Sequence, residues 1–400
     1  MARLHEYQGK EILKRHRIGV PKGRVISSPG EARAAAESIG GPVVVKAQAW
    51  TTGRAGLGAI RFAANPGEAE AAASSILGMT IGSFTVDDYG VFRHPELGVE
   101  IAREFDRPPS ELEKIAWKVE SGDYRGTFYF IQMEQGFRKG DRYVGFHGAG
   151  GGGSMMSMDA ALKEGFRIAN FTDTSGNPPA SKVYRAAKII LSQPGIDGYF
   201  ASGSGVASQE QFHSARGLIK AFWEENPGIP AVIRLGGNQE ERAIAILTEG
   251  AKHLAAPLEA FGKNDSADAC AARLRTLLDA PARKTPVAKT PLQARPAPSD
   301  PYTFKTVTGS ITYDHQVCRT CETKPCITEC VPKILKSEDS VPVLNISRED
   351  AAKGKCIECL ACETECVTKG KGGAFIDLPI EGLEAWRTAA TAASPGGTRR

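Results

Sequence analysis

Eight of the nine cysteines fall between residues 318 and 366, in two runs of four. The runs are Cys318-x2-Cys321-x4-Cys326-x3-Cys330 and Cys356-x2-Cys359-x2-Cys362-x3-Cys366. Thiolates two residues apart on a tight turn can bind one inorganic cube, and a thiolate three residues further on can reach a second cube. The spacing therefore predicts two [4Fe–4S] clusters, with these eight cysteines as the metal ligands.

Two other kinds of site use clustered cysteines. Zinc sites usually take two CxxC pairs rather than two runs of four, and zinc stands as the alternative metal. A disulfide framework is expected in secreted proteins, but the N-terminus, Met1-Ala-Arg-Leu-His-Glu-Tyr, lacks the apolar core of a signal peptide. Because cluster ligands need a reducing compartment during assembly, we expect a cytoplasmic protein.

Residues 306–378 resemble the two-cluster ferredoxins, in which the fourth cysteine of each run binds the cluster of the other run. The resemblance implies that one cluster is held by Cys318, Cys321, Cys326 and Cys366. It implies that the other is held by Cys356, Cys359, Cys362 and Cys330. The sequence departs from the commonest bacterial form in two ways: four residues separate Cys321 from Cys326, and no proline directly follows Cys330 or Cys366.

Length and composition set the broad class. Four hundred residues predict two or three domains, and 41% hydrophobic with 24% charged residues is ordinary for a soluble globular protein. A net charge of +4 gives no reason to expect nucleic acid or a membrane surface as a partner. No apolar run approaches eighteen residues, so no transmembrane segment is predicted.

The first part of the chain could handle phosphate. The pattern predicts helices over residues 4–18 and 31–39, and strands over 24–26, 43–47 and 59–62. Lys46 ends a buried strand, and Gly53, Arg54 and Ala55 follow in a glycine-rich loop. An ammonium beside accessible backbone N–H groups suits the phosphates of a nucleotide. The alternative is a solvated surface lysine next to a loop.

Three segments resemble the opening of succinyl-CoA synthetase β subunits, whose N-terminal part is an ATP-grasp domain. They are Leu4-His-Glu-Tyr-Gln-Gly-Lys-Glu-Ile-Leu, Val44-Val-Lys46-Ala-Gln and Gly53-Arg-Ala-Gly. The resemblance implies that Lys46, Gly53, Arg54 and Ala55 contact ATP or ADP. It also implies that Glu100 lies near the adenosine of that nucleotide.

The resemblance breaks at residues 85–143, which are too few for the family's second ATP-grasp subdomain and its Mg²⁺ ligands. This stretch predicts only strands over 115–120 and 127–133. It contains no Glu-Ile-Asn-Pro equivalent, and Glu120 and Glu134 are the nearest acidic residues. Because bound Mg²⁺ neutralises the charge of the transferring phosphoryl group, we do not expect this chain alone to hydrolyse a nucleotide.

The resemblance returns over residues 143–278, where strands alternate with helices. Strands are predicted over 143–146, 169–171, 198–201 and 230–235, with helices over 157–164, 181–192, 209–225, 240–249 and 266–278. Alternation of this kind predicts a flavodoxin-like, doubly wound parallel sheet. Gly150, Gly151 and Gly152 lie between a strand and a helix, which suits an anion cradle, although a tight turn is the simpler alternative.

In the synthetase β subunit this domain packs on a CoA-binding α subunit and faces the α subunit's phosphohistidine. The resemblance implies contacts from Ala149, Ser204, Gly205 and Val206. The family has asparagine where Ala149 stands, so succinate specificity is not implied. His147 precedes the loop and either faces this site or is a structural histidine.

The predicted fold is an α/β multidomain protein with a partial ATP-grasp domain, a flavodoxin-like sheet and a small ferredoxin-type α+β domain. The boundaries are 1–142 for the ATP-grasp-like domain, 143–279 for the flavodoxin-like domain, 280–303 for a proline-rich linker, 304–386 for the ferredoxin-like domain and 387–400 for a disordered tail.

The combination gives three hypotheses for function. The first is a subunit of a CoA-linked oxidoreductase, in which the β-like body docks an α-like CoA-binding partner and the clusters exchange electrons with a redox partner. The second is an ATP- or ADP-dependent acyl-CoA ligase β subunit with an iron–sulfur appendage. The third is an electron-transfer adaptor whose β-like part serves only for docking. The CoA thioester is expected on the partner subunit.

Overall fold

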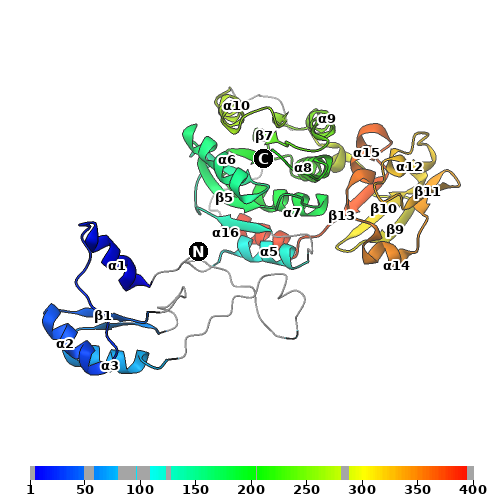
Figure 1. The fold of residues 1–400 in the computed structure, drawn as a ribbon. Coiled ribbons are helices and arrows are strands. Elements are labelled where there is room, and N and C mark those ends of the chain that lie inside the picture. The colour runs from blue at the N-terminus through cyan, green and yellow to red at the C-terminus, as the bar shows by residue number, and fades with distance from the viewer. Residues whose placement is uncertain are drawn as a thin grey trace. The chain divides into compact units, whose positions relative to one another are not determined.

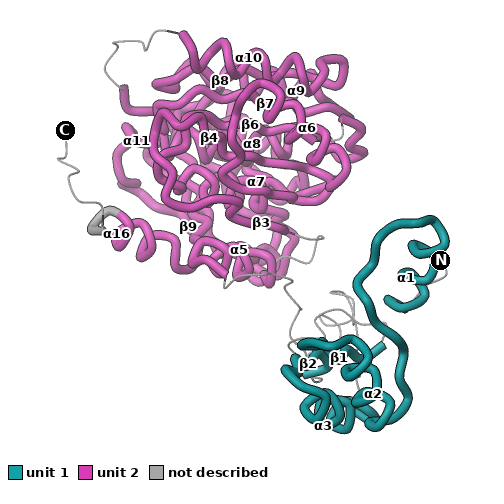
Figure 2. Tube along the Cα trace, turned by 90° about the vertical axis from the view of Figure 1, so that its left-hand side faces the viewer, with its two compact units in different colours: residues 1–104 teal, residues 105–400 magenta. Residues whose placement is uncertain are grey.

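The structure is a computed structural model that describes residues 5–48, 58–79, 96, 109–122, 128–203, 205–280 and 288–393. The chain forms two compact units, Met1–Glu104 and Phe105–Arg400 (Figures 1 and 2). The division after Glu104 lies inside the range that the sequence assigns to a first domain. Among the described residues, no helix combines the length and the apolar character needed to cross a membrane.

The first unit contains an antiparallel pair of strands, β1 (Val43–Lys46) and β2 (Ile60–Ala63). Helices α2 (Pro29–Ile39) and α3 (Pro66–Ile76) pack on each other and on these strands, and α1 (Glu6–Arg15) precedes them. Both packed helices begin alike, because Ser28 and Asn65 cap the first turn and proline follows each cap. The strand predicted over 24–26 is wrong, since these residues pair with no described strand.

The second unit is organised around a six-stranded sheet in the order β3-β5-β4-β6-β7-β8. The strands are β3 (Tyr129–Gln132), β4 (Tyr143–His147), β5 (Arg167–Asp173), β6 (Gly198–Ser202), β7 (Ala231–Arg234) and β8 (Leu258–Phe261). All neighbours pair in parallel except β3, which lies antiparallel to β5 at the edge. Counted from β4, the parallel strands follow the 2-1-3-4-5 order of flavodoxin-like sheets, as the sequence predicts.

Helices cover both faces of this sheet. Alternate residues of the strands, such as Phe146 and Phe200, pack with α6 (Gly151–Lys163) and α10 (Ala267–Asp279). The intervening residues, such as Tyr199 and Ile233, pack with the other group. That group is α7 (Ala180–Leu191), α8 (Phe212–Glu225) and α9 (Glu240–Ala251). The period of two along the strands thus supplies two apolar cores, one on each side.

Two local predictions in this unit fail. Residues 115–120 belong to a helix, α5 (Glu111–Ser121), rather than a strand. Ser110 caps this helix, and Leu112, Ile115 and Ala116 are buried on one face against α7 and β3, which is the helical period. Helix α6 starts at Gly151, six residues before the predicted start at 157, so the glycines form its first turn.

The cysteine-rich part combines a three-stranded antiparallel sheet, ordered β13-β10-β9, with a hairpin of β11 and β12. The strands are β9 (Pro301–Lys305), β10 (Ser310–Asp314), β11 (Leu335–Glu338), β12 (Val341–Leu344) and β13 (Ala374–Asp377). Its helical segments are α12 (His315–Arg319), α13 (Pro325–Thr328), α14 (Arg348–Asp350), the π-helical turn η2 (Ala351–Lys355) and α15 (Ala361–Lys369). This is an α+β arrangement of the kind that the sequence predicts for residues 304–386.

The predicted linker and tail are both packed where the structure describes them. Residues 281–287 lie outside the described residues, but α11 (Pro291–Ala294) follows them. The Thr290 hydroxyl, fully buried, donates to the Trp223 carbonyl of α8. Helix α16 runs over Leu383–Ala393, and Arg387 donates to the Ser192 hydroxyl at 2.7 Å. The expectation of disorder from residue 387 is therefore wrong for the start of that range.

Candidate functional site

The eight clustered cysteines line two separate cavities. One cavity has Cys318, Cys321, Cys326 and Cys366 in its wall. The other has Cys330, Cys356, Cys359 and Cys362 in its wall. These are the two sets that the resemblance to two-cluster ferredoxins implies. All eight side chains are buried, each at most 8% exposed.

Two short helices produce this crossed arrangement. Helix α13 packs against α15, and the residues that follow α13 continue to Cys330. Along α15, Cys362 and Cys366 lie one turn apart, yet they face different cavities. Cys326 and Cys330 are separated in the same way. Each run of four therefore contributes three cysteines to one cavity and its fourth to the other.

Positive backbone φ angles allow the turns between the cysteines. Glu358 and Leu360 flank Cys359 with φ of 50° and 60°, and Lys324 before Cys326 has φ of 41°. These are non-glycine residues in the left-handed region, which side chains rarely adopt. Strain of this kind concentrates where the surrounding structure fixes a functional loop. Here it turns the chain so that successive thiols face the same cavity.

The surroundings of the buried thiols disfavour the deprotonated form that binds a metal. Burial and the neighbouring thiols raise the pKa of Cys318, Cys326 and Cys356 to about 12. Backbone N–H groups partly oppose this effect at Cys366, where residues 371–374 face the sulfur. A bound metal centre reverses such a preference, because coordination deprotonates the thiol outright. Four thiols in the wall of each cavity are a donor set that suits an iron–sulfur cluster.

Zinc sites and iron–sulfur cubes require different separations between the thiols. None of the nine cysteines forms a disulfide. Among the described residues, no three His, Cys, Asp or Glu side chains converge closely enough to hold one metal ion. Four sulfurs around a single zinc ion would lie about 3.8 Å apart, given a Zn–S bond of about 2.3 Å. Thiols that bind separate irons of a cube stand further apart than this.

A second site lies at the carboxyl ends of β4 and β6, the switch point of the parallel sheet. A small cavity there is lined by His147, Ala149, Thr174, Gly203 and Gly205. Ligands of doubly wound sheets bind at this edge, where the strand order reverses. The structure therefore brings the loop after β4 and the loop after β6 together, as the sequence predicts.

Backbone conformation and close contacts explain why glycine occurs at several positions of this edge. Gly150 has φ of 87°, and its N–H donates to Asp173 at 2.9 Å, so a carboxylate already lies beside the start of α6. Gly151 and Gly152 are exposed in the first turn of that helix. Gly205 has φ of 78°, and a Cβ there would lie 2.7 Å from Arg234, which also donates to the Gly203 carbonyl. Arg234 thus supports the loop, whereas Val206 is 81% exposed.

His147 is neutral in the structure. Its Nδ1 lies 2.6 Å from the Tyr199 hydroxyl, and burial lowers the pKa of His147 to about 3. The side chain is buried at the end of β4 and lines the switch-point cavity. A neutral imidazole at this position can accept or donate a hydrogen bond but carries no charge toward an anion.

Lys46 lies at the end of β1 in the first unit. Its ammonium is 3.1 Å from the Glu6 carboxylate of α1, and both side chains line a cavity of about 660 Å³. Hydrogen bonds from Lys10 and Lys46 lower the pKa of Glu6 to about 2. A nucleotide phosphate at Lys46 would compete with this carboxylate. Four residues predicted for the nucleotide, Gly53, Arg54, Ala55 and Glu100, lie outside the described residues, as does Ser204 of the switch-point loop.

Buried ion pairs, which the sequence reasoning missed, join the cysteine-rich part to the sheet domain. The Lys220 ammonium, on α8, is 2.6 Å from Glu363 and 2.7 Å from Glu224. The Arg216 guanidinium is 2.9 Å from Glu365, the residue before Cys366. Arg216 and Lys220 lie four residues apart on a helix that is buried over most of its length, but nothing in the local sequence identifies their partners.

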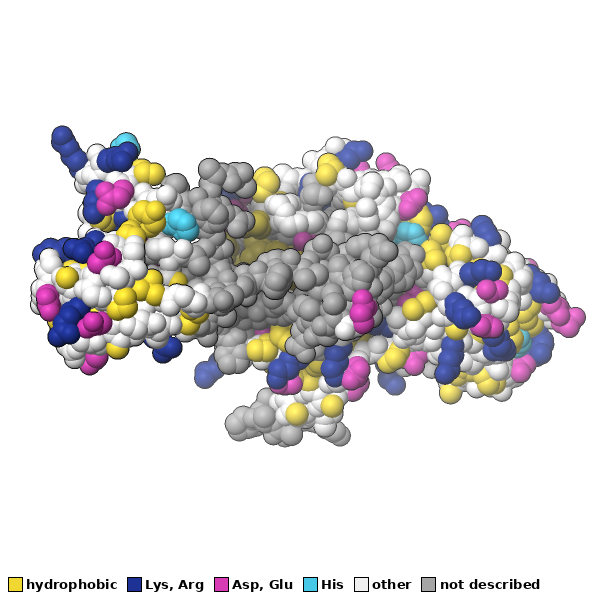
Figure 3. Space-filling model, turned by 60° about the horizontal axis from the view of Figure 1, so that its bottom comes forward, with side chains coloured by type: hydrophobic (Ala, Val, Ile, Leu, Met, Phe, Trp, Pro, Cys, Tyr) yellow, Lys and Arg dark blue, Asp and Glu magenta, His cyan; other side chains and the backbone are white. Residues whose placement is uncertain are grey.

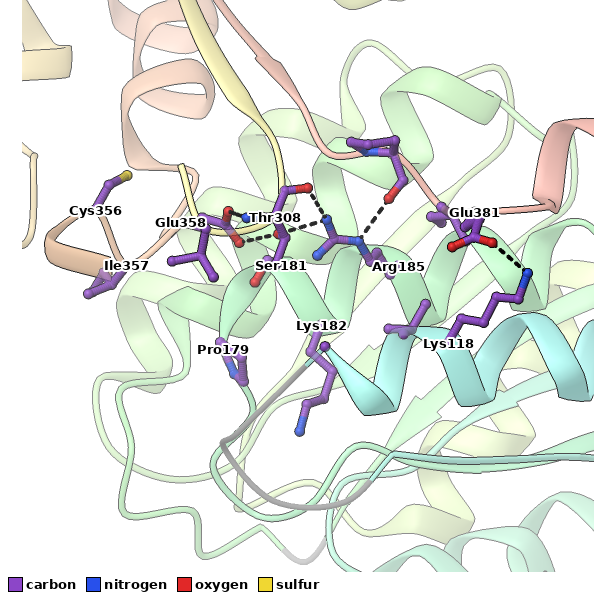
Figure 4. Close-up of a pocket in the computed structure, with 15 residues that line it drawn as sticks. Lys118, Pro179, Ser181, Lys182, Arg185, Thr308, Cys356, Ile357, Glu358 and Glu381 are labelled. Atoms are coloured by element: carbon purple, nitrogen blue, oxygen red, sulfur yellow. Dashed lines mark hydrogen bonds and ion pairs between the residues drawn. The ribbon is translucent and has the colours of Figure 1, made fainter. Parts of the chain in front are cut away.

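A third cavity, of about 210 Å³, lies along the same junction and reaches Cys356 (Figure 4). Arg185 of α7 points across it and donates to Thr308 at 2.8 Å and to the Pro379 carbonyl at 3.3 Å. Glu358 accepts from the Thr308 hydroxyl at 2.7 Å, so the turn that carries Cys359 is tied to the sheet domain. Burial lowers the pKa of Lys182, which also lines this cavity, to about 8.

The exposed surface of the cysteine-rich part carries both signs of charge. In Figure 3, dark blue and magenta side chains are intermixed on the right-hand end, where these residues lie. Salt bridges such as Lys336–Glu338 and Lys353–Glu349 pair neighbouring charges there. On the face shown, the charge therefore forms no field of a single sign.

Comparisons with known proteins find a family match for the first part of the chain and similar proteins for a larger part of it. Residues 3–104 match the family described as "ATP-grasp domain". The chain is 27% identical to the succinate–CoA ligase [ADP-forming] subunit beta of Roseiflexus sp. (strain RS-1), over 64% of this chain and 96% of that protein. It is 25% identical to the [GDP-forming] subunit beta of Thermus thermophilus, over 61% of this chain and 93% of that protein.

The match to the Roseiflexus protein also shows how many aligned positions have no residue in this chain. It extends over 366 positions but uses 64% of 400 residues, which is about 256, so about 110 positions have no residue here.

Among solved structures, the ATP citrate lyase of Methanothrix soehngenii in complex with citrate and coenzyme A aligns with a TM-score of 0.40 and 20% identity, over 47% of this chain and 48% of that one. Residues 3–104 thus match an ATP-grasp domain, and the chain is similar to succinate–CoA ligase β subunits.

Proposed function

We propose that the chain is the β-like subunit of an ATP- or ADP-dependent acid–CoA ligase that also carries two [4Fe–4S] clusters. The observation that carries the ligase part is the similarity to succinate–CoA ligase β subunits, in a match that spans one relative from near its start to near its end but leaves about 110 positions without a residue here. The reaction class converts a carboxylic acid, CoA and ATP into an acyl-CoA, ADP and phosphate, or runs in the reverse direction.

The switch-point site supports a role for a partner subunit. Its cavity is small, and the loops around it are held by Arg234 and Asp173 rather than by groups that could react. The exposed first turn of α6 leaves backbone N–H groups for an anion supplied from outside the chain. We therefore propose an α-like partner that binds CoA and presents its acyl or phosphoryl group at this edge.

The two cysteine-lined cavities support the cluster part. Cys318, Cys321, Cys326 and Cys366 would hold one cluster, and Cys330, Cys356, Cys359 and Cys362 the other. Clusters of this type take up and release single electrons. This chain contributes the thiols, the dry surroundings and the backbone N–H groups that face Cys366.

A second candidate function is a subunit of a CoA-linked oxidoreductase, in which a one-electron carrier protein exchanges electrons with the clusters. The specific observation in its favour is the ion-paired junction, which fixes the cysteine-rich part against the sheet domain. About 110 positions of the relative are also missing, which weakens ordinary nucleotide chemistry. Lys46 and the ATP-grasp match favour the ligase.

The experiment is a paired assay on the chain purified anaerobically together with an α-like CoA-binding subunit. The ligase proposal expects ADP formation that requires both a carboxylic acid and CoA. The oxidoreductase candidate expects oxidation of a reduced viologen dye that requires an added CoA thioester and no nucleotide. Absence of acid- and CoA-dependent ADP formation, together with thioester-dependent dye oxidation, would overturn the ligase proposal in favour of the second candidate.

A further inference from the structure

Tyr313 lies at the centre of the cysteine-rich part, on the middle strand β10. Its backbone faces Ala374 on β13 and Tyr302 on β9, so strands on both sides fix its position. The side chain is fully buried. Its hydroxyl has no hydrogen-bond partner of ordinary geometry among the described residues, and the side chain it interacts with is that of Cys362.

The hydroxyl is directed toward thiols. Tyr313 lines the cavity of Cys330, Cys356, Cys359 and Cys362. After burial itself, its pKa is raised by the charged forms of Cys362 and Cys326, by a hydrogen-bond interaction with the Cys362 side chain, and by the charged form of Cys330. Cys326 belongs to the other cavity. Tyr313 therefore lies where the two sets of thiols approach each other.

The other groups that line the cavity supply few hydrogen-bond acceptors for the Tyr313 hydroxyl. Most of the remaining wall is apolar, with Phe304, Ile311, Ile334, Leu335 and Leu360. The carboxylate in the wall, Glu358, already accepts from the Thr306 and Thr308 hydroxyls, each at 2.7 Å. The Cys362 thiol is thus the group with which the hydroxyl interacts, and the charged sulfur of a bound cluster would accept its hydrogen bond.

We propose that the Tyr313 hydroxyl donates a hydrogen bond to a sulfur of the cluster held by Cys330, Cys356, Cys359 and Cys362, and so raises the reduction potential of that cluster. This inference rests on the proposed clusters. A hydrogen bond to sulfur stabilises the more negative, reduced cluster more than the oxidised one. Tyr313 is thus a positioning and tuning residue, because it changes the energy of the added electron without binding iron.

The test is an anaerobic redox titration of the full chain, followed by EPR, on wild type and Tyr313→Phe. The substitution keeps the ring and removes the donor. The expected result is full iron content with one of the two midpoint potentials lowered. A tenfold change in the ratio of reduced to oxidised cluster corresponds to about 59 mV for one electron. Tyr302→Phe is the matched control, since the Tyr302 hydroxyl accepts from Leu344 at 3.3 Å and should leave both potentials unchanged.

The outcomes separate this inference from the proposed function. Wild type without iron means that the clusters themselves are wrong. Full iron with both potentials unchanged, or with both lowered equally, overturns the role of Tyr313. If Tyr313→Phe loses iron, wild type grown with 3-fluorotyrosine decides, because its hydroxyls are stronger donors and one potential should rise. An unchanged potential in that labelled protein would also overturn the inference.

Discussion

At the scale of residues, the cysteines are the part of the site that local spacing encodes. The spacing of the eight cysteines predicts that they are ligands, whereas their division into two sets is implied by the resemblance to two-cluster ferredoxins. The Tyr313 hydroxyl and the Lys46–Glu6 pair could not be predicted in this way, because each depends on a partner brought in by the fold. Spacing identifies ligands, whereas tertiary structure supplies their surroundings.

The crossed ligand sets give the first prediction. Cys366→Ala should cost the same cluster as Cys318→Ala, although the two residues lie in different runs. The measurement is iron content with EPR on anaerobically purified protein, and the expected loss is about half of the iron. Cys270→Ala, a buried cysteine of α10 outside both cavities, is the control and should keep all the iron. Loss of different clusters in Cys366→Ala and Cys318→Ala would contradict the crossed arrangement.

The second prediction concerns the nucleotide. Lys46→Ala should weaken ATP or ADP binding by roughly 1.5–3 kcal/mol, since one charge-assisted contact is lost. Isothermal titration calorimetry of the chain measures this directly. Lys10→Ala is the matched control, because Lys10 also pairs with Glu6, at 2.9 Å, but is not a predicted phosphate contact. Equal binding by wild type and Lys46→Ala would remove Lys46 from the nucleotide site.

At the scale of elements, the strongly periodic segments follow the sequence and the ambiguous ones do not. The sequence predicts a strand over residues 115–120 because the run is too short to show a clear period. The Ser110 cap and the burial of side chains at helical spacing instead stabilise a helix, α5. β8 (Leu258–Phe261) went unpredicted, since four residues at a sheet edge give little signal. The glycines before residue 154 suggested a loop, although they form the first turn of α6.

A pH-dependent contribution to stability belongs to helix α8 and gives the third prediction. Burial alone would raise the pKa of Glu224, but Lys220 and Lys188 outweigh it and lower the pKa to about 2. The folded-state pKa lies below the ordinary value of 4.5, so the stabilisation is present above pH 4.5 and is lost as the pH falls toward 2. Glu224 contributes up to about 3 kcal/mol to the free energy of unfolding in this way.

Urea unfolding between pH 7 and pH 2, followed by the fluorescence of buried Trp223, tests this contribution. Glu224→Gln should be less stable than wild type at pH 7 and should lose less stability between pH 4.5 and 2. Glu111→Gln is the control, because Glu111 is an exposed residue of a salt bridge on α5. Parallel pH profiles for wild type and Glu224→Gln would show that Glu224 makes no such contribution.

At the scale of the whole molecule, the cysteine-rich part is built into the second unit. The linker prediction followed from closely spaced prolines such as Pro281, Pro286 and Pro296, but Thr290 and Arg387 show that both flanking segments pack on α8 and its neighbours. Ion pairs such as Lys220–Glu363 join residues more than 140 positions apart and have no local sequence pattern. For that reason the junction could not be predicted, although each of the parts that it joins could.

The junction gives the fourth prediction. Lys220→Met should lower the free energy of unfolding by roughly 3–5 kcal/mol, because it leaves Glu363 buried without one of its partners. It should also speed proteolysis between the sheet domain and the cysteine-rich part. Lys163→Met is the matched control, since the Lys163–Asp268 pair is exposed and should be worth less than about 1 kcal/mol. Equal stability of the two variants would mean that the junction is not held by buried charge.

The most direct test of the central claim is the metal content of the full chain purified without oxygen. Two cubes held by eight thiols predict about eight irons and about eight acid-labile sulfides per chain, with no zinc. On reduction, EPR should show two interacting clusters. One or two zinc ions per chain, with no labile sulfide, would contradict the account.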